Sequence, residues 1–206
     1  CANRASNDIP RAAFTTRELT ELTLHFYRRN YIEGLFLSSG IFGSPDTTLE
    51  RLIAVVKGLR KVHGFRGYIH LKCIPGASAP LVQEAGLYAD RLSVNIEIPT
   101  DENLQRRAAD KSHGSVLGPM DVIREGIAEN RDERRRFRSA PLFAPAGQST
   151  QLVVGASPEP DLVILNLADR LYKSRGLRRV YYSAYVSVNP EDSRLPCLHE
   201  PPLRRE

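Results

Sequence analysis

The chain has 206 residues, of which 41% are hydrophobic and 26% charged, and it carries a net charge of +5. This length and composition suffice for one sizeable core and predict one or two domains. No apolar run approaches the roughly 18 residues that span a bilayer, so we expect no membrane partner. The positive charge permits a phosphate-rich partner but does not require one.

The three cysteines are Cys1, Cys73 and Cys197. They are odd in number and far apart, which makes a poor disulfide framework and favours a reducing compartment. We therefore expect a cytoplasmic protein.

Helix-like and strand-like segments alternate along the whole chain. Thr15 or Thr16 can cap the first helix, and the apolar residues of the second recur once per turn. Strands are expected at residues 33–37, 67–71, 91–97, 151–154 and 178–184. Helices are expected at residues 15–29, 46–59, 78–87, 101–109, 119–137 and 161–175. Such alternation with short links predicts a parallel sheet in an α/β fold.

Polar residues stand at the carboxyl ends of several predicted strands: Ser38, Ser39, Lys72, Asn95, Glu97 and Ser183. In a (βα) barrel these ends line one mouth, where ligands bind. A doubly wound sheet would concentrate them at one crevice instead. Their spread over successive strands favours a partial (βα)6-type, TIM-like barrel.

Two further features are the run Cys1-Ala2-Asn3-Arg4 and the strand end Gly34-Leu35-Phe36-Leu37-Ser38-Ser39-Gly40. Their order resembles the opening of radical S-adenosylmethionine (SAM) enzymes, and residues 93–100, 147–156 and 178–184 continue the resemblance. It extends to a subgroup named, by analogy, for DNA modification or repair. In the superfamily a C-x3-C-x2-C loop holds a [4Fe–4S] cluster.

The resemblance implies that Cys1 is the third cluster cysteine, a metal ligand. The first strand and the first two cysteines would then be missing, because one thiolate cannot hold a cluster that needs three protein ligands. We therefore expect an inactive fragment. Residues 1–188 would form a truncated barrel lacking its first strand, and the proline-rich residues 189–206 a linker to a missing carboxyl-terminal region.

The resemblance also implies a SAM site. Ser38, Ser39 and Gly40 occupy the place where the superfamily binds the amino group of SAM, although Ser-Ser-Gly is also common in turns. Gly155 and Ala156 match the place where backbone packs against adenine, and Ser183 ends another strand facing the same mouth.

Asn95 and Glu97 alternate with apolar residues, which on a strand puts both on one face. The resemblance suggests that they bind the ribose and the carboxylate of SAM. The alternative is that they pair with each other or with Lys72. Lys72 itself could meet the cofactor carboxylate or a substrate phosphate, or it could extend into solvent.

The function implied for the intact enzyme is reductive cleavage of SAM at the [4Fe–4S] cluster. The 5′-deoxyadenosyl radical so formed would abstract hydrogen from a substrate, which the basic composition allows to be a nucleic acid. SAM and an electron donor are the expected partners.

Two alternatives stay open. The first is a non-radical barrel that binds a phosphorylated small molecule through Lys72 and helix N-termini. The second is a non-catalytic nucleic-acid-binding module that uses the arginines of residues 131–138. Only Phe137 and Phe143 lie near that run, which argues against the second alternative, and a solvated helix face is the simpler interpretation of the arginines. We expect His113 to lie in a solvated loop.

Overall fold

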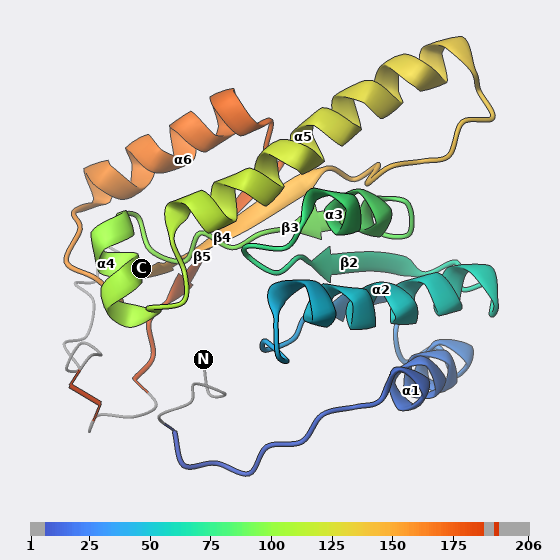
Figure 1. The fold of residues 1–206 in the computed structure, drawn as a ribbon, viewed down its shortest axis with the longest axis horizontal. Helices are drawn as coiled ribbons and strands as arrows, with labels where there is room; N and C mark the ends of the chain where they lie inside the picture. The colour runs from blue at the N-terminus through green and yellow to red at the C-terminus, as the bar shows by residue number, and fades with distance from the viewer. Residues whose placement is uncertain (1–6, 188–191, 194–206) are drawn as a thin grey trace.

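A single parallel sheet forms the centre of the computed structural model, which describes residues 7–187 and 192–193 (Figure 1). The strands are β1 (Gly34–Leu37), β2 (Tyr68–Lys72), β3 (Arg91–Ser93), β4 (Gln148–Val154) and β5 (Arg179–Ala184). Their order in the sheet is their order in the chain, and every neighbouring pair is parallel.

Helices connect the strands. They are α1 (Thr16–Arg28), α2 (Pro45–Lys61), α3 (Ala79–Gly86), α4 (Asp101–Arg107), α5 (His113–Arg136) and α6 (Asp161–Arg175). Figure 1 shows α2, α3, α5 and α6 along one face of the sheet, and α4 beyond the end toward which the strands point. Within the described residues, none of these helices has the length and apolar character needed to cross a bilayer.

Alternation along each strand separates the helix-covered face from the opposite, inner face. On the helix-covered side, Ile69, Leu71 and Leu92 are fully buried and belong to the main hydrophobic core. The residues between them, Tyr68, His70 and Lys72, therefore point to the inner face. Burial of one face by helices holds the sheet together, and the other face presents mostly polar side chains.

This arrangement confirms the predicted α/β partial TIM-like barrel. A doubly wound sheet would show a reversal of strand order with helices on both faces, and this sheet has neither. All five expected strand segments are present. The prediction that a strand at the amino-terminal side is missing concerns chain outside the described residues, as do the predicted linker positions 194–206.

Two element boundaries differ from the predictions by four residues or more. Regular β3 stops at Ser93 instead of running to Glu97, because the Thr150 hydroxyl takes over the pairing: it donates to Val94 O (2.8 Å) and accepts from Ile96 N (3.0 Å). Helix α5 begins at His113 rather than Pro119, because Ser112 and Ser115 form a capping box.

Pro119 lies inside α5, where its missing N–H would leave the carbonyl four residues earlier without a partner. That carbonyl, Ser115 O, accepts a hydrogen bond from Gly76 N at 2.8 Å. The loop after β2 thus supplies the hydrogen bond that the carbonyl of Ser115 lacks within the helix, which explains why the helix continues through the proline.

Candidate functional site

The residues predicted to bind SAM lie at the carboxyl end of the sheet. Lys72 is the last residue of β2, Asn95 and Glu97 follow β3, and Ser183 is the second-last residue of β5. Ser38 to Gly40 follow β1, and Gly155 and Ala156 follow β4. Carboxyl ends of parallel barrel strands share one mouth, so a common location was the main expectation for these residues.

Glu97 forms an ionic cluster at this end. Its Oε1 atom lies 3.4 Å from Lys72 Nζ and 3.6 Å from Lys111 Nζ. Pairing of Glu97 with Lys72 is the alternative that the sequence left open. The cluster holds two positive charges and one negative, so it keeps one net positive charge for an anionic group.

The backbone of Glu97 is left-handed, with φ of 63°. Such a conformation is unfavourable for a residue with a side chain and is found more often at binding sites than elsewhere. It also ends the strict strand alternation on which the prediction for Asn95 and Glu97 was based. Glu97 reaches the lysines through a turn in the chain, not as the next inward residue of a regular strand.

A second group of side chains joins three strands. Asn95 Nδ2 donates to Gln151 Oε1 at 3.3 Å, and Gln151 Nε2 donates to Ser183 Oγ at 2.8 Å. Asn95 is only 7% exposed. Gln151 was missed by the sequence analysis. The available signal was its place two residues after Ser149, which puts both on the same face of a strand.

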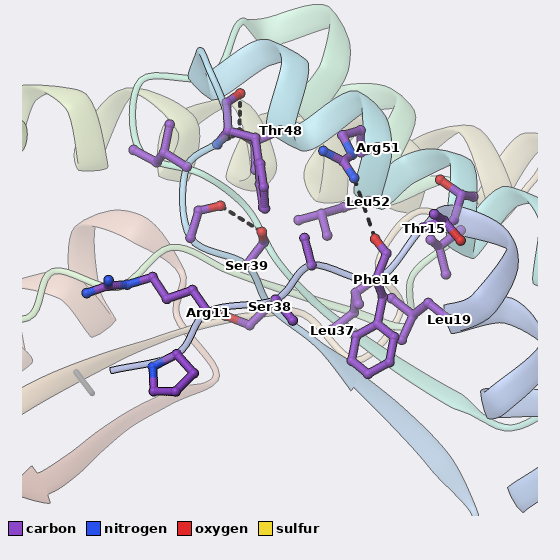
Figure 2. Close-up of a pocket in the computed structure, with 18 residues that line it drawn as sticks. Arg11, Phe14, Thr15, Leu19, Leu37, Ser38, Ser39, Thr48, Arg51 and Leu52 are labelled. Atoms are coloured by element: carbon purple, nitrogen blue, oxygen red, sulfur yellow. Dashed lines mark hydrogen bonds between the residues drawn. The ribbon is translucent and has the colours of Figure 1, made fainter. Parts of the chain in front are cut away.

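Within the part of the chain that the structure describes, no hydrogen bond joins Ser38, Ser39 or Gly40 to these groups. They line a separate hollow of about 640 Å³ between β1, the start of α2 and the segment before α1. Figure 2 shows Ser38 and Ser39 beside Arg11 in this hollow, with Arg51 reaching across to Phe14. Ser39 Oγ donates to Gly40 O at 2.6 Å, which leaves the hydroxyl lone pairs available as acceptors.

Glu159, which the sequence analysis also missed, ties the loop after β4 to the start of α4. Its Oε1 atom accepts hydrogen bonds from Thr100 Oγ1 (2.5 Å) and Asn103 Nδ2 (2.9 Å). Burial alone would raise the pKa of Glu159, but the hydrogen bonds from Ser157, Thr100 and Asn103 outweigh it and lower that pKa. The carboxylate therefore stays charged and fixes the rim of the mouth.

The prediction of a solvated loop for His113 was wrong. His113 starts α5; its backbone N–H donates to Asp101 Oδ1 at 2.6 Å, and its Nε2 atom lies 3.0 Å from Ile98 O. Both contacts come from the segment that includes α4, so the histidine holds two parts of the rim together.

The metal-ligand prediction falls on Cys1, which lies outside the described residues. Among the described residues, no group of three or more His, Cys, Asp or Glu side chains could hold a metal ion. Cys73 is fully buried, and burial raises the pKa of its thiol to about 12, so it does not provide a thiolate ligand. The described residues thus do not themselves form a cluster site.

The arginines at the end of α5 are partly engaged within the chain. Arg135 pairs with Asp132 at 3.2 Å, and Arg134 donates to Ala140 O. Phe137, at the same end, is exposed. These contacts agree with a solvated helix face.

Comparison with known proteins identifies the fold. No protein-family model and no curated protein sequence matches the chain. Among solved structures, the chain is similar to HydG, a maturase of the [FeFe]-hydrogenase, with a TM-score of 0.62 and 13% identity over 89% of this chain. It also matches OxsB, a cobalamin-dependent S-adenosylmethionine radical enzyme, with TM-scores of 0.46 and 0.47 and identities of 11% and 10% over 88% of this chain.

The matched region is 38% of the HydG chain and 24% of the OxsB chain. At these identities the likeness to HydG defines the architecture, a partial TIM-like barrel, and function has to be argued from the site.

Proposed function

We propose that this chain belongs to a radical SAM enzyme whose intact form binds SAM at the carboxyl end of the sheet. The observation that carries the proposal is the convergence of Lys72, Asn95, Glu97 and Ser183 on that end of a barrel with the HydG architecture. The resemblance of the opening residues supports the same assignment. When bound to a [4Fe–4S] cluster held by Cys1 and further cysteines, SAM would supply the hydrogen-abstracting radical, with an electron donor as partner.

The residues of this chain fit the three polar parts of SAM. The hydroxyls of Ser38 and Ser39 and the Gly40 carbonyl can accept from its ammonium group. Lys72 and Lys111, which share a single carboxylate, can meet its carboxylate. Asn95 can hydrogen-bond the ribose. Gly155, with φ of 85°, turns the backbone directly after β4, where Ala156 offers a small side chain for adenine to approach.

The finer proposal is that the substrate is a nucleic acid and that the enzyme acts in the cytoplasm. Its support is the net charge of +5 and the chain segments that resemble the DNA-modification subgroup. The substrate side of the site would be the inner face of the sheet, because the helices cover the other face.

Binding of SAM to the intact, anaerobically reconstituted protein tests the proposal. Asn95→Ala should remove one or two hydrogen bonds to SAM and weaken its binding roughly tenfold to a hundredfold. The iron–sulfur absorption spectrum should stay unchanged, because Asn95 is not a ligand. Cys1→Ala should instead abolish that spectrum.

The control is Asn166→Ala, which removes the same amide from an exposed position on α6. It should leave SAM binding and the spectrum unchanged. If Asn95→Ala bound SAM and formed 5′-deoxyadenosine as the unaltered protein does, the assignment of this strand end to the cofactor would be wrong.

A further inference from the structure

The inner face of the sheet carries more positive charge than the proposed SAM site uses. Besides Lys72, the inner-face alternation assigns Arg91 at the start of β3 and Arg179 at the start of β5 to this face. The acid at its carboxyl end, Glu97, is already shared between Lys72 and Lys111. Within the described residues, neither Arg91 nor Arg179 forms an ion pair with an acidic side chain.

Short side chains lie next to these two arginines, and Ser93 follows Arg91 by two residues on the same face of β3. Ser93 on β3 is paired in register with Ser149 on β4, and Ser149 is paired with Arg179 on β5. Adjacent strands are about 4.8 Å apart, so the two serines form a low floor between longer side chains. His70 bounds this floor on the β2 side, where its Nε2 atom lies 2.9 Å from Ser93 Oγ.

Two buried polar atoms on this face have no hydrogen-bond partner within the described part of the chain. They are Ser149 Oγ, in a residue that is 1% exposed, and Arg91 Nη1. Arg91 uses another nitrogen, Nε, to donate to the Tyr68 hydroxyl at 2.8 Å. A buried donor without an acceptor costs about 1–3 kcal/mol, so each of these two donors calls for an acceptor group. They belong to neighbouring strands, β3 and β4.

The charges around His70 indicate which kind of acceptor group this part of the inner face would bind. Burial, together with the charges of Arg91 and Lys72, lowers the pKa of His70 to about 4, so the ring is neutral near pH 7. Burial is the larger cause of this shift, and the two nearby cations, Arg91 and Lys72, are what would attract an anion to this part of the face. An oxyanion can accept from a guanidinium and a hydroxyl at once, and arginine binds phosphate well because its planar donors match the phosphate oxygens.

Aromatic rings accompany the cations on the same face. Phe36, Tyr68 and Tyr181 are 60%, 44% and 42% exposed, and the alternation along β1, β2 and β5 assigns all three to the inner face. The Phe36 ring meets the His70 ring at 4.8 Å between centroids. Exposed flat rings beside arginines are the combination that stacks nucleobases and holds their phosphates.

We infer that the inner face binds a nucleotide unit, with its phosphate between Arg91, Arg179 and Ser149 and its base against the exposed aromatic rings. This inference deepens the proposed function, since it gives the substrate a chemical class and a place. It does not depend on the cluster or on SAM, so binding can be measured on the chain without either.

Isothermal titration calorimetry with pyrimidine ligands tests the inference. Pyrimidines are chosen because a purine could bind at the site proposed for the adenine of SAM. Thymidine 5′-monophosphate should bind at least tenfold more tightly than thymidine. An oligonucleotide of eight thymidylates separates the two sources of the same chemistry. If the oligonucleotide binds more tightly than thymidine 5′-monophosphate, the ligand is a single strand of nucleic acid. If the two affinities are equal, the ligand is a free nucleotide.

Ser149→Ala is the most informative variant. Its hydroxyl makes no hydrogen bond to any other described residue, so the variant should be as stable as the unaltered protein or more stable, yet bind the monophosphate several-fold less well. Arg91→Gln should weaken binding of the monophosphate at least tenfold and leave binding of thymidine unchanged. Arg170→Gln, on the exposed side of α6, is the matched charge control and should have no effect.

Three results would overturn the inference: thymidine binding as tightly as its monophosphate, Ser149→Ala losing stability without losing affinity, or Arg170→Gln weakening binding as much as Arg91→Gln. An ordered water on Ser149 would give the second result. None of these outcomes would affect the SAM assignment, which is tested by Asn95→Ala.

Discussion

Glu97 Oε1 lies between Lys72 Nζ and Lys111 Nζ, at 3.4 Å and 3.6 Å, so one carboxylate links the end of β2 to the segment between α4 and α5. The side chains are only 22% to 25% exposed. Neutralising the carboxylate would leave two nearby ammonium groups without their shared counter-charge. Glu97 is thus the residue on which the charge balance of this rim depends.

We expect Glu97→Gln to lower the free energy of unfolding by about 1 kcal/mol at low ionic strength, with a smaller loss in about 1 M salt, because salt screens the repulsion between the lysines. Urea titrations at the two salt concentrations measure this. Glu102→Gln is the control, since Glu102 pairs with Arg106 on the exposed surface of α4 and should matter less. A salt-independent loss would contradict the electrostatic explanation.

Thr150 provides a side-chain continuation of the sheet, and we expect Thr150→Val to destabilise the protein by about 2–4 kcal/mol. The valine keeps the shape but leaves Val94 O and Ile96 N buried without partners. Thr150→Ser keeps the hydroxyl and should cost only about 1 kcal/mol for the lost methyl group. Thermal or urea unfolding of the two variants compares them. Equal losses would mean that the methyl group, not the hydroxyl, matters.

A glycine inside α5 should tolerate no side chain. Glycine to alanine normally stabilises a helix by up to about 1 kcal/mol. A Cβ on Gly126, however, would lie 2.7 Å from Phe143 Cζ, and the Phe143 ring cannot retreat because it also fills the space above Gly86. We expect Gly126→Ala to cost about 1–3 kcal/mol.

Gly58→Ala in α2 is the matched control, since no atom of the described residues lies within 4 Å of a Cβ added there. It should be neutral or stabilising in the same unfolding assay. If both variants were stabilised, the packing of Phe143 between the two glycines would be looser than described.

The stability should depend on pH through His70. Its pKa falls from 6.5 to about 4 on folding, chiefly because of burial and secondarily because of Arg91 and Lys72. The unfolded chain therefore binds a proton between these values that the folded protein does not, so stability is full above pH 6.5 and is lost as the pH falls toward 4. Partial solvent access limits the loss to roughly 1–2 kcal/mol.

His70→Asn should flatten the pH dependence over this range, because asparagine does not titrate. Urea unfolding at several pH values, compared between the variant and the unaltered protein, isolates the contribution of this histidine from that of other groups. Parallel curves for the two proteins would show that His70 does not contribute.

Local patterns were enough to predict most of the architecture. Alternation in residues 67–71 and helical periodicity in residues 46–59 correspond to β2 and α2, and Thr15 does cap α1 in a capping box with Glu18. The early end of β3 could not be predicted, because the partner of Ile96 N is a side chain 54 positions away. The extent of α5 depends on Gly76, which is likewise distant in sequence from Ser115.

For the candidate site, the sequence predicted which strand ends lie together, but not which side chains hydrogen-bond or pair with the predicted residues. Parallel strands bring their carboxyl ends together, so Lys72, Asn95, Glu97 and Ser183 were expected at one end. Gln151, which links two of them, and Lys111, which completes the ionic cluster, come from other parts of the chain. The left-handed backbone at Glu97 has no signature in the sequence, since glutamate rarely adopts it.

The strand order has a consequence for biosynthesis. Among the five described strands, each pairs with the strand that precedes it in the chain, and none inserts between two earlier ones. The sheet can therefore lengthen one βα unit at a time as the chain leaves the ribosome, without waiting for distant sequence. Every stage of that growth has an open trailing edge until the next unit emerges, so a translational pause after β4 would expose the edge that β5 later covers.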